Sequence, residues 1–210
     1  MGTSSIIDII ASAVVAGLLL LIALRLNAQA SETSMIYNGS VTLQQNMVVL
    51  VGWIERDFRG IGYCKDYTKV PIPQKAIRLA DSSKIRFWTD VNNTGNLDSI
   101  TWYVGPTSEM SSTENPRDRK IYRVVNNGTP VGWNLGVTQF KLQYYDVDGD
   151  LLSTPVAQPA LIYSMQISLA CESPVPFAEE YRTTTSADSL ADFQVFWRQL
   201  RLAARNLKNR

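Results

Sequence analysis

Oxygen-bearing side chains occupy every second position between residues 90 and 98, a spacing that could bind a cation. They are Asp90, Asn92, Thr94, Asn96 and Asp98, with Gly95 at the sixth place of the run. Calcium loops use oxygen ligands at such alternate positions and a glycine at position six for the sharp turn. Thr101 stands at position twelve, where these loops carry a bidentate glutamate. The spacing predicts a calcium site, with an ordinary hairpin turn rich in Asn and Gly as the alternative.

A second acidic turn follows further along the chain and contains Asp146, Asp148 and Asp150. Three carboxylates so close together repel one another unless water or a metal ion separates them. This turn is therefore the other candidate for calcium. Calcium is the only cofactor that the sequence suggests.

The residue types that most enzymes need are scarce. The chain of 210 residues contains no histidine, the commonest general base and metal ligand. It shows no Ser or Cys nucleophile motif and no Gly-rich phosphate loop. We therefore expect a protein that is not an enzyme. The formal net charge of +1 gives no reason to expect a nucleic-acid partner.

The two cysteines, Cys64 and Cys171, form no CxxC pair, so zinc binding is not expected. If the body of the protein lies outside the cytoplasm, one disulfide between them is the simplest interpretation. Cys171 falls on the inward face of a predicted strand, where it could meet Cys64 at the end of a predicted helix.

These residues must be positioned by a chain that begins with an apolar segment, residues 6–24, interrupted only by Asp8 and Ser12. As a helix it would be about 28 Å long, close to the hydrocarbon thickness of a bilayer. Three interpretations fit: a signal peptide cleaved near residues 28–30, a membrane anchor, or a membrane helix that is later buried in a polymer. The acidic Asp8 and the lack of Lys or Arg before it disfavour a signal peptide.

Small residues in this segment, Gly17 among them, permit close packing between helices. A carboxylate such as Asp8 is costly in lipid and usually has a partner. Two roles for Asp8 remain open. It could pair with the positive N-terminus of a neighbouring subunit, or it could cap the start of its own helix, where the dipole favours it.

A second helical pattern covers residues 41–64. Its apolar residues recur at three- and four-residue spacing, as on one face of an amphipathic helix: Met47, Leu50, Val51, Ile54, Phe58 and Ile61. Gly60 and Gly62 are expected to end it, and Asn38–Gly39 to break or kink the chain before it. We expect a long N-terminal helix whose apolar half protrudes and whose amphipathic half packs on the body.

The body has the alternating pattern of antiparallel strands. Strands are predicted at 84–89, 99–104, 120–125, 137–145 and 163–171, with turns at 90–98, 126–128 and 146–150. The expected fold class is α+β, a long helix laid across an antiparallel sheet. The expected organisation is an apolar helix and its extension at 1–40, an amphipathic half at 41–64, a β head at 65–187 and a basic C-terminal segment at 188–210.

The C-terminal segment fits two patterns. Leu190, Phe193, Leu200 and Leu207 have helical spacing, whereas the alternation through Phe193 and Val195 to Trp197 fits a strand. Its arginines and lysines form either a solvated face or a surface that binds another subunit.

Several of these stretches together resemble one family. Residues 43–46 and 54–64 resemble the helix end of PilW-class minor type IV pilins and of the J-type pseudopilins of type II secretion. Residues 120–125 and 136–146 resemble two strands of that family, and residues 204–207 are similar to its closing motif. Asp8 lies six residues after Gly2, near the place of the glutamate that follows the family's cleavage site.

The resemblance implies a structural subunit of an extracellular pilus-like filament, with copies of itself or other pilin-like subunits as partners. Before assembly it would lie in the bacterial inner membrane with its head in the periplasm. The assembly residues expected on the helix are Asp8, Ile9, Ile10, Val14, Gly17, Leu18 and Leu21. The alternatives are a low-copy pseudopilin of a secretion or pilus-initiation complex and a membrane-anchored periplasmic binding module.

Overall fold

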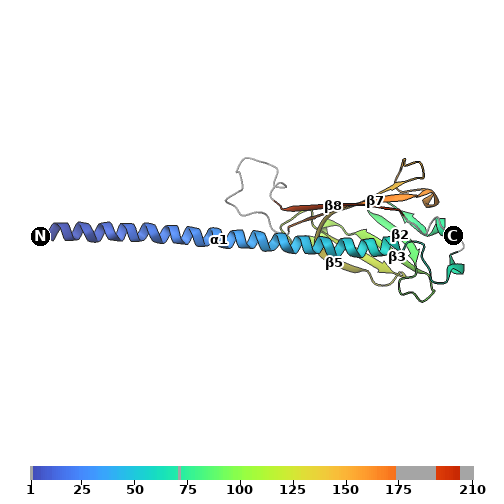
Figure 1. Ribbon diagram of the computed structural model, residues 1–210, viewed down its shortest axis with the longest axis horizontal. Helices are drawn as coiled ribbons and strands as arrows, with labels where there is room; N and C mark the ends of the chain where they lie inside the picture. Colours follow the sequence, from blue (N-terminus) through green and yellow to red (C-terminus); the bar gives the residue numbers. More distant parts are fainter. Residues whose placement is uncertain (1, 71, 174–192, 204–210) are drawn as a thin grey trace.

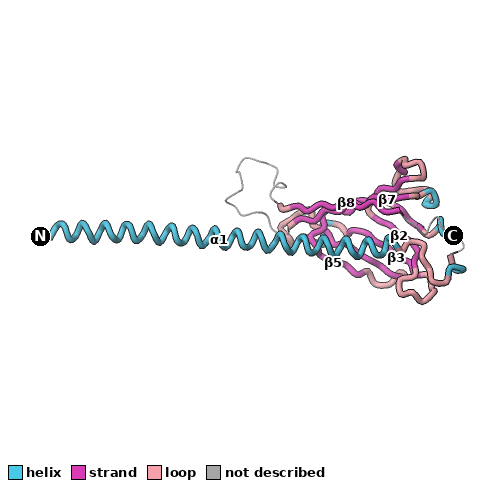
Figure 2. Tube along the Cα trace, viewed as in Figure 1, coloured by secondary structure: helices cyan, strands magenta, loops and turns pink. Residues whose placement is uncertain are grey.

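The computed structural model describes residues 2–70, 72–173 and 193–203, with side chains from residue 6 onward. One long helix dominates it (Figure 1). This helix, α1 (Gly2–Arg59), has 58 residues, which corresponds to about 87 Å at 1.5 Å per residue. Its N-terminal half stands clear of the other elements, and its C-terminal half lies along a sheet (Figure 2). The α+β fold class is confirmed.

α1 runs through Asn38–Gly39 without interruption, so the predicted break is wrong. One glycine in a helix costs only about 1 kcal/mol relative to alanine, which is small against the long helical segments on both sides. The apolar and amphipathic halves are therefore one continuous rod.

The helix ends at Arg59, as the following glycines predict. Gly62 has a φ of 74°, in the left-handed region that favours glycine. Its N–H donates to the carbonyl of Trp88, which ties the turn after the helix to the sheet. The predicted amphipathic face is confirmed, because Leu50, Ile54 and Phe58 are buried.

The sheet has eight antiparallel strands in the order β1-β2-β3-β4-β5-β7-β8, with β6 paired to β5. The strands are β1 (Ile77–Ala80), β2 (Lys84–Thr89), β3 (Asp98–Val104), β4 (Arg119–Val125), β5 (Val131–Tyr145), β6 (Leu151–Leu152), β7 (Ser164–Glu172) and β8 (Val195–Ala203). Short 3-10 helices lie between them at Tyr67–Lys69, Pro73–Lys75, Thr107–Met110 and Pro159–Leu161. The inner face of the sheet packs on α1, where the ring of Phe58 meets that of Phe87 edge-on at 5.5 Å.

The five strands predicted from alternation are all present, but β5 begins at Val131 rather than at residue 137. β5 pairs first with β4 and then with β7, and the change of partner falls at Gly136 and Val137. Gly136 has a φ of 73°, and a Cβ there would lie 2.5 Å from the carbonyl oxygen of Glu172. Alternation does not signal β1 and β6, which have four and two residues.

In its described part, 193–203, the C-terminal segment is a strand and not a helix. β8 pairs in register with β7, from Val195 opposite Glu172 to Ala203 opposite Ser164. Leu200 and Leu202 are buried, while Trp197 is exposed on the other face. Residues 188–192 and 204–210 of the predicted basic segment lie outside the described residues.

Candidate functional site

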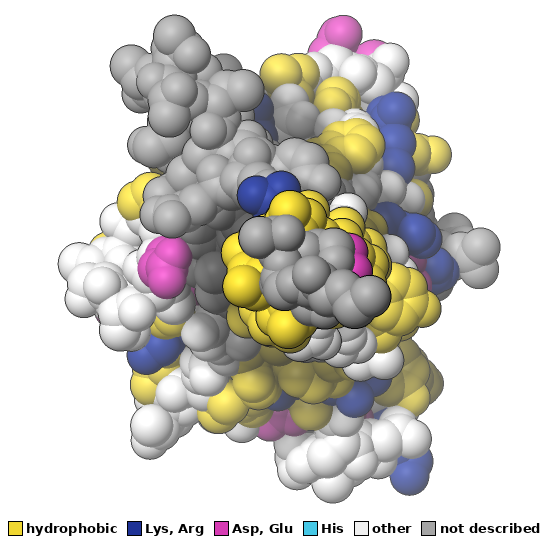
Figure 3. Space-filling view, turned by 90° about the vertical axis from the view of Figure 1, so that its left-hand side faces the viewer, with side chains coloured by type: hydrophobic (Ala, Val, Ile, Leu, Met, Phe, Trp, Pro, Cys, Tyr) yellow, Lys and Arg dark blue, Asp and Glu magenta, His cyan; other side chains and the backbone are white. Residues whose placement is uncertain are grey.

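The N-terminal half of α1 is an uncovered apolar surface. Its large apolar side chains from Ile6 to Leu26 are between 54% and 67% exposed. They include the predicted assembly residues Ile9, Ile10, Val14, Leu18 and Leu21. A Cβ on Gly17 would meet none of the described residues within 4 Å. Figure 3, seen from the N-terminal end, shows hydrophobic side chains around the helix.

By length and composition this helix could cross a membrane. Its most apolar 18-residue window has a mean hydropathy of 2.7, and none of that window is buried within the protein. Apolar surface exposed to water costs about 25 cal/mol per Å². The described part of the head does not supply that cover.

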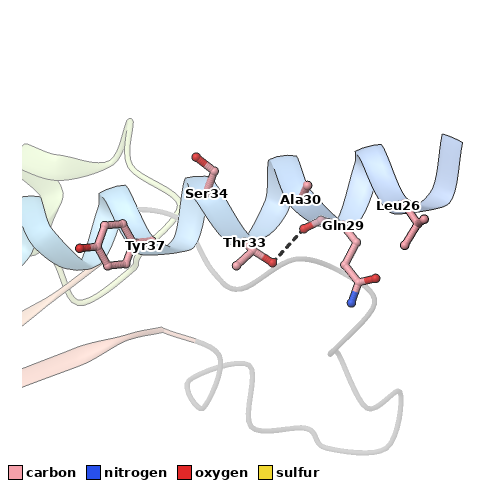
Figure 4. A pocket seen from close by; sticks show the side chains of 6 residues that line it. All are labelled: Leu26, Gln29, Ala30, Thr33, Ser34 and Tyr37. Carbon is pink, nitrogen blue, oxygen red and sulfur yellow. Dashed lines mark hydrogen bonds between the residues drawn. The ribbon is translucent and has the colours of Figure 1, made fainter. Parts of the chain in front are cut away.

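A shallow hollow on the next part of α1 is shown in Figure 4. The six residues drawn around it all belong to this helix: Leu26, Gln29, Ala30, Thr33, Ser34 and Tyr37. The hydroxyl of Thr33 donates to the carbonyl of Gln29 at 2.8 Å, within the helix itself. The polar groups of these six residues are hydroxyls and one amide, with no carboxylate, amine or thiol beside the hydroxyls to activate them.

The predicted calcium loop is organised by hydrogen bonds to its own oxygens. The carboxylate of Asp90 accepts from the backbone N–H groups of Lys65 at 3.2 Å, Thr94 at 3.0 Å and Gly95 at 2.7 Å. Burial opposes ionisation of Asp90, but these N–H groups outweigh it and hold its pKa below the usual value. The carboxylate of Asp90 therefore accepts hydrogen bonds from the backbone of this turn, in the place where a calcium ligand was expected.

The other oxygens of this loop also have partners. Asp98 accepts a 2.6 Å hydrogen bond from the amide of Asn126, which follows β4. The ammonium of Lys69 donates a 2.8 Å hydrogen bond to the side-chain oxygen of Asn96. The hydroxyl of Thr94 donates a 2.8 Å hydrogen bond to the side-chain oxygen of Asn92. A cation at this loop would have to displace these donors.

The second acidic turn is built in the same way. One carboxylate oxygen of Asp146 accepts from the backbone N–H groups of Asp148 at 3.0 Å and Asp150 at 2.9 Å. Over the described ranges of the chain, no three Asp, Glu or Cys side chains come together in an arrangement that could hold a metal ion. Calcium binding at either turn stays a prediction, and the geometry favours hydrogen-bonded turns.

The predicted disulfide is absent: Cys64 and Cys171 both lie in the described part of the chain, and no disulfide joins them. Cys171 is next to Glu172 on β7. The carbonyl oxygen of Glu172 lies against Gly136, and Leu43 of α1 lies against the same glycine. Cys64 comes after the other end of the packed helix. The helix rise from residue 43 to residue 59 alone is about 24 Å, whereas a disulfide joins Cα atoms roughly 4.4–6.8 Å apart.

The thiol of Cys171 is also poorly suited to oxidation. Burial, with a smaller effect of the Asp118 and Glu172 carboxylates, raises its pKa to about 12. The thiolate that attacks in disulfide formation is therefore scarce at neutral pH.

A buried polar cluster that the sequence does not reveal lies at the base of the head, where α1 leaves it. Glu172 is 7% exposed and forms an ion pair with Arg117, Nη2 to Oε2 2.7 Å. Its carboxylate also accepts from the amide of Asn115 at 2.9 Å and from the hydroxyl of Thr138 at 3.1 Å. These residues come from three separate stretches, so no sequence motif marks them.

Asp118 lies next to this cluster and supports a prediction about pH. It is 1% exposed, and neither carboxylate oxygen makes a hydrogen bond of normal geometry within the described ranges; the backbone N–H of Arg119 and the hydroxyl of Thr113 lower its pKa only in part. Burial, and in smaller part the charge of Glu172, raises its pKa. A carboxyl group with a raised pKa in the folded state makes a contribution to stability that is fully present below its unfolded-state pKa and is lost as pH rises through its folded-state pKa.

We therefore expect Asp118→Asn to raise the free energy of unfolding at pH 8 by about 1 kcal/mol, because a buried neutral amide costs less than an unpaired carboxylate. The gain should shrink as the pH falls toward 4, because the raised pKa makes Asp118 increasingly protonated. Urea unfolding of the detergent-solubilised chain at several pH values measures it. Asp148→Asn, on an exposed turn, is the control. A gain that is the same at pH 4 and pH 8 would contradict this account.

A second buried network joins α1 to the sheet. Asp57 is 6% exposed and accepts from the indole N–H of Trp102 on β3 at 2.9 Å. Arg123 on β4 donates to the same carboxylate through Nε at 2.5 Å and Nη2 at 3.3 Å. All three residues belong to the predicted elements, but nothing in their spacing indicates that they meet.

No protein-family model matches this chain, and no curated protein matches it either. Among solved structures, the chain is similar to a type IV-like pilin from Thermus thermophilus, with 11% sequence identity and a TM-score of 0.49. The match covers 79% of this chain and 98% of that chain. A likeness of this degree does not assign the chain to a family.

Proposed function

We propose that this chain is a pilin-like structural subunit, anchored in a membrane by the apolar half of α1 and assembled through the same helix into an extracellular filament. One observation carries the proposal. The uncovered apolar half of α1 is continuous with a half that is packed on the head. A rigid rod of this kind holds the apolar surface away from the head, so the helix can reach neighbouring subunits while the head stays outside.

Exchange of lipid for other helices is physically reasonable for this segment. Lipid tails are as apolar as leucine, so helix association in a membrane depends on close packing rather than on the hydrophobic effect. Ala13, Ala16 and Gly17 are small, and within the described part of the chain nothing fills the space beside Gly17. Neighbouring helices could therefore approach closely here.

The sequence resemblance to minor pilins and pseudopilins supports a second candidate, a low-copy subunit at the end of a filament or in a secretion complex. The two candidates predict different distributions of the head. A major subunit labels the whole filament, and a low-copy subunit labels its end.

The test is electron microscopy of filaments sheared from cells, labelled with an antibody to the head, with mass spectrometry of the N-terminus. We expect the chain in the filaments and the segment 6–26 protected by other subunits. If the chain stays a detergent-soluble monomer and is absent from filaments, the proposal fails and an anchored binding module becomes the better explanation.

A further inference from the structure

Two charged side chains, one of each sign, lie in the uncovered half of α1. Between residues 6 and 31 the sequence contains no other charged residue than Asp8 and Arg25. Both are exposed, and neither is among the ion pairs that the described residues form. The two are seventeen residues apart, about 25 Å along a helix, so they cannot pair within one copy.

Each charge lies in a largely apolar stretch of α1. Asp8 lies between Ile7 and Ile9, and Arg25 lies between Leu24 and Leu26, all of which are exposed apolar side chains. When neighbouring subunits cover these side chains, they also remove the water around the two charges. A charge buried without a partner is strongly unfavourable, so assembly of this helix must supply one for each.

We propose that, in the assembly, Asp8 of one copy forms an ion pair with Arg25 of a second, parallel copy displaced by about 25 Å along the helix axis. The inference rests on the proposed function, since it names the contact that joins the subunits. Charge complementarity favours a second copy as the occupant of this helix face, because each helix presents one acid and one base.

This pairing joins each copy to the next in an open series of subunits rather than in a closed ring or dimer. Residues seventeen apart differ by about 100° around the axis of a helix with 3.6 residues per turn, so Asp8 and Arg25 face different neighbours. Each copy therefore pairs its Asp8 with one neighbour and its Arg25 with another. A head-to-tail contact of this kind generates an open polymer, whereas a two-fold contact would stop at a dimer.

Glu32 is the competing partner for Arg25. It is half-buried and lies seven residues further along α1, so this pairing needs a displacement of about 10 Å. A pairing of Arg25 with Glu32 would leave Asp8 without a partner in the more apolar segment. Glu32 itself lies in a more polar stretch, between Ser31 and Thr33. One carboxylate oxygen of Glu32 is already buried without a hydrogen-bond partner among the described residues, so its burial does not depend on assembly, whereas Asp8 loses its water only when another copy covers it.

The test is a charge swap in the full-length chain, with filaments counted by electron microscopy. Asp8→Arg and Arg25→Asp should each reduce filament number at least tenfold, and the double variant should restore at least half of it. The matched swap, Arg25→Glu with Glu32→Arg, should not restore assembly. Restoration by that swap, or no restoration by the first, overturns the pairing.

A second measurement does not depend on charge reversal. Co-expressed Asp8→Cys and Arg25→Cys chains should form a disulfide-linked dimer in filaments, whereas either chain alone should form none. Filaments without the mixed dimer overturn the pairing but leave the proposed function intact. A wild-type chain that forms no filaments overturns the proposed function and this pairing with it.

Discussion

A lysine in place of Leu18 is expected to abolish assembly. Leu18 lies in the middle of the uncovered half of α1 and is 55% exposed, so it has no role in the core of the head. A lysine at the centre of a membrane helix costs about 2.5–3.5 kcal/mol on insertion scales, which is roughly a hundredfold in an equilibrium constant. The nearest acid in the same segment, Asp8, is ten residues away.

The measurements are filament number and the membrane-bound fraction of the full-length chain. Leu18→Lys should reduce filaments to background, while Leu18→Ala, which removes size without adding charge, should reduce them only moderately. Val147→Lys is the matched control, because Val147 is 71% exposed on a turn of the head. Urea unfolding of the head should be the same for all these chains. Normal filaments from Leu18→Lys would show that this surface is not buried on assembly.

The two halves of α1 could be predicted from the sequence because each has a simple pattern. Apart from Asp8 and Ser12, residues 6–24 are apolar around the whole helix, and Leu50, Ile54 and Phe58 repeat at helical spacing. The break expected at Gly39 did not occur, because local propensity is weak against a long helix on both sides. Strand alternation likewise placed β2 correctly but could not show where β5 changes its partner.

The contacts between distant residues were the least predictable part. Cys171 does lie on the inward face of its strand, as alternation indicates. Whether it meets Cys64 depends on the direction of β7 relative to α1, and that direction is set by the whole sheet. The same holds for Asp57, Trp102 and Arg123, which come from three elements. Periodicity shows which face is buried but not which polar groups meet there.

Asp57→Asn is expected to lower the free energy of unfolding of the head by about 3–5 kcal/mol, the usual cost of removing one partner of a buried ion pair. The guanidinium of Arg123, whose side chain is 17% exposed, would lose its counter-charge. The indole N–H of Trp102, which is fully buried, would meet a weaker acceptor. Urea unfolding followed by tryptophan fluorescence is a suitable measurement, because Trp102 and Trp133 stack with ring centroids 6.1 Å apart.

The matched control is Glu55→Gln on the same helix. Glu55 pairs with Arg59 at 3.9 Å, but the two side chains are 34% and 64% exposed. An exposed pair of this kind contributes about 0.5 kcal/mol or less. If Asp57→Asn costs no more than this control, the buried network does not hold α1 against the sheet.

A double variant separates the pair itself from the cost of an unpaired charge. Asp57→Leu with Arg123→Met removes both charges and keeps apolar volume, and such replacements of a buried ion pair are often close to neutral. We expect the double variant to be more stable than Asp57→Asn alone. That result would mean that most of the cost of Asp57→Asn comes from leaving Arg123 without its counter-charge. A double variant at least as unstable as the single one would instead mean that the charge pair itself stabilises the fold.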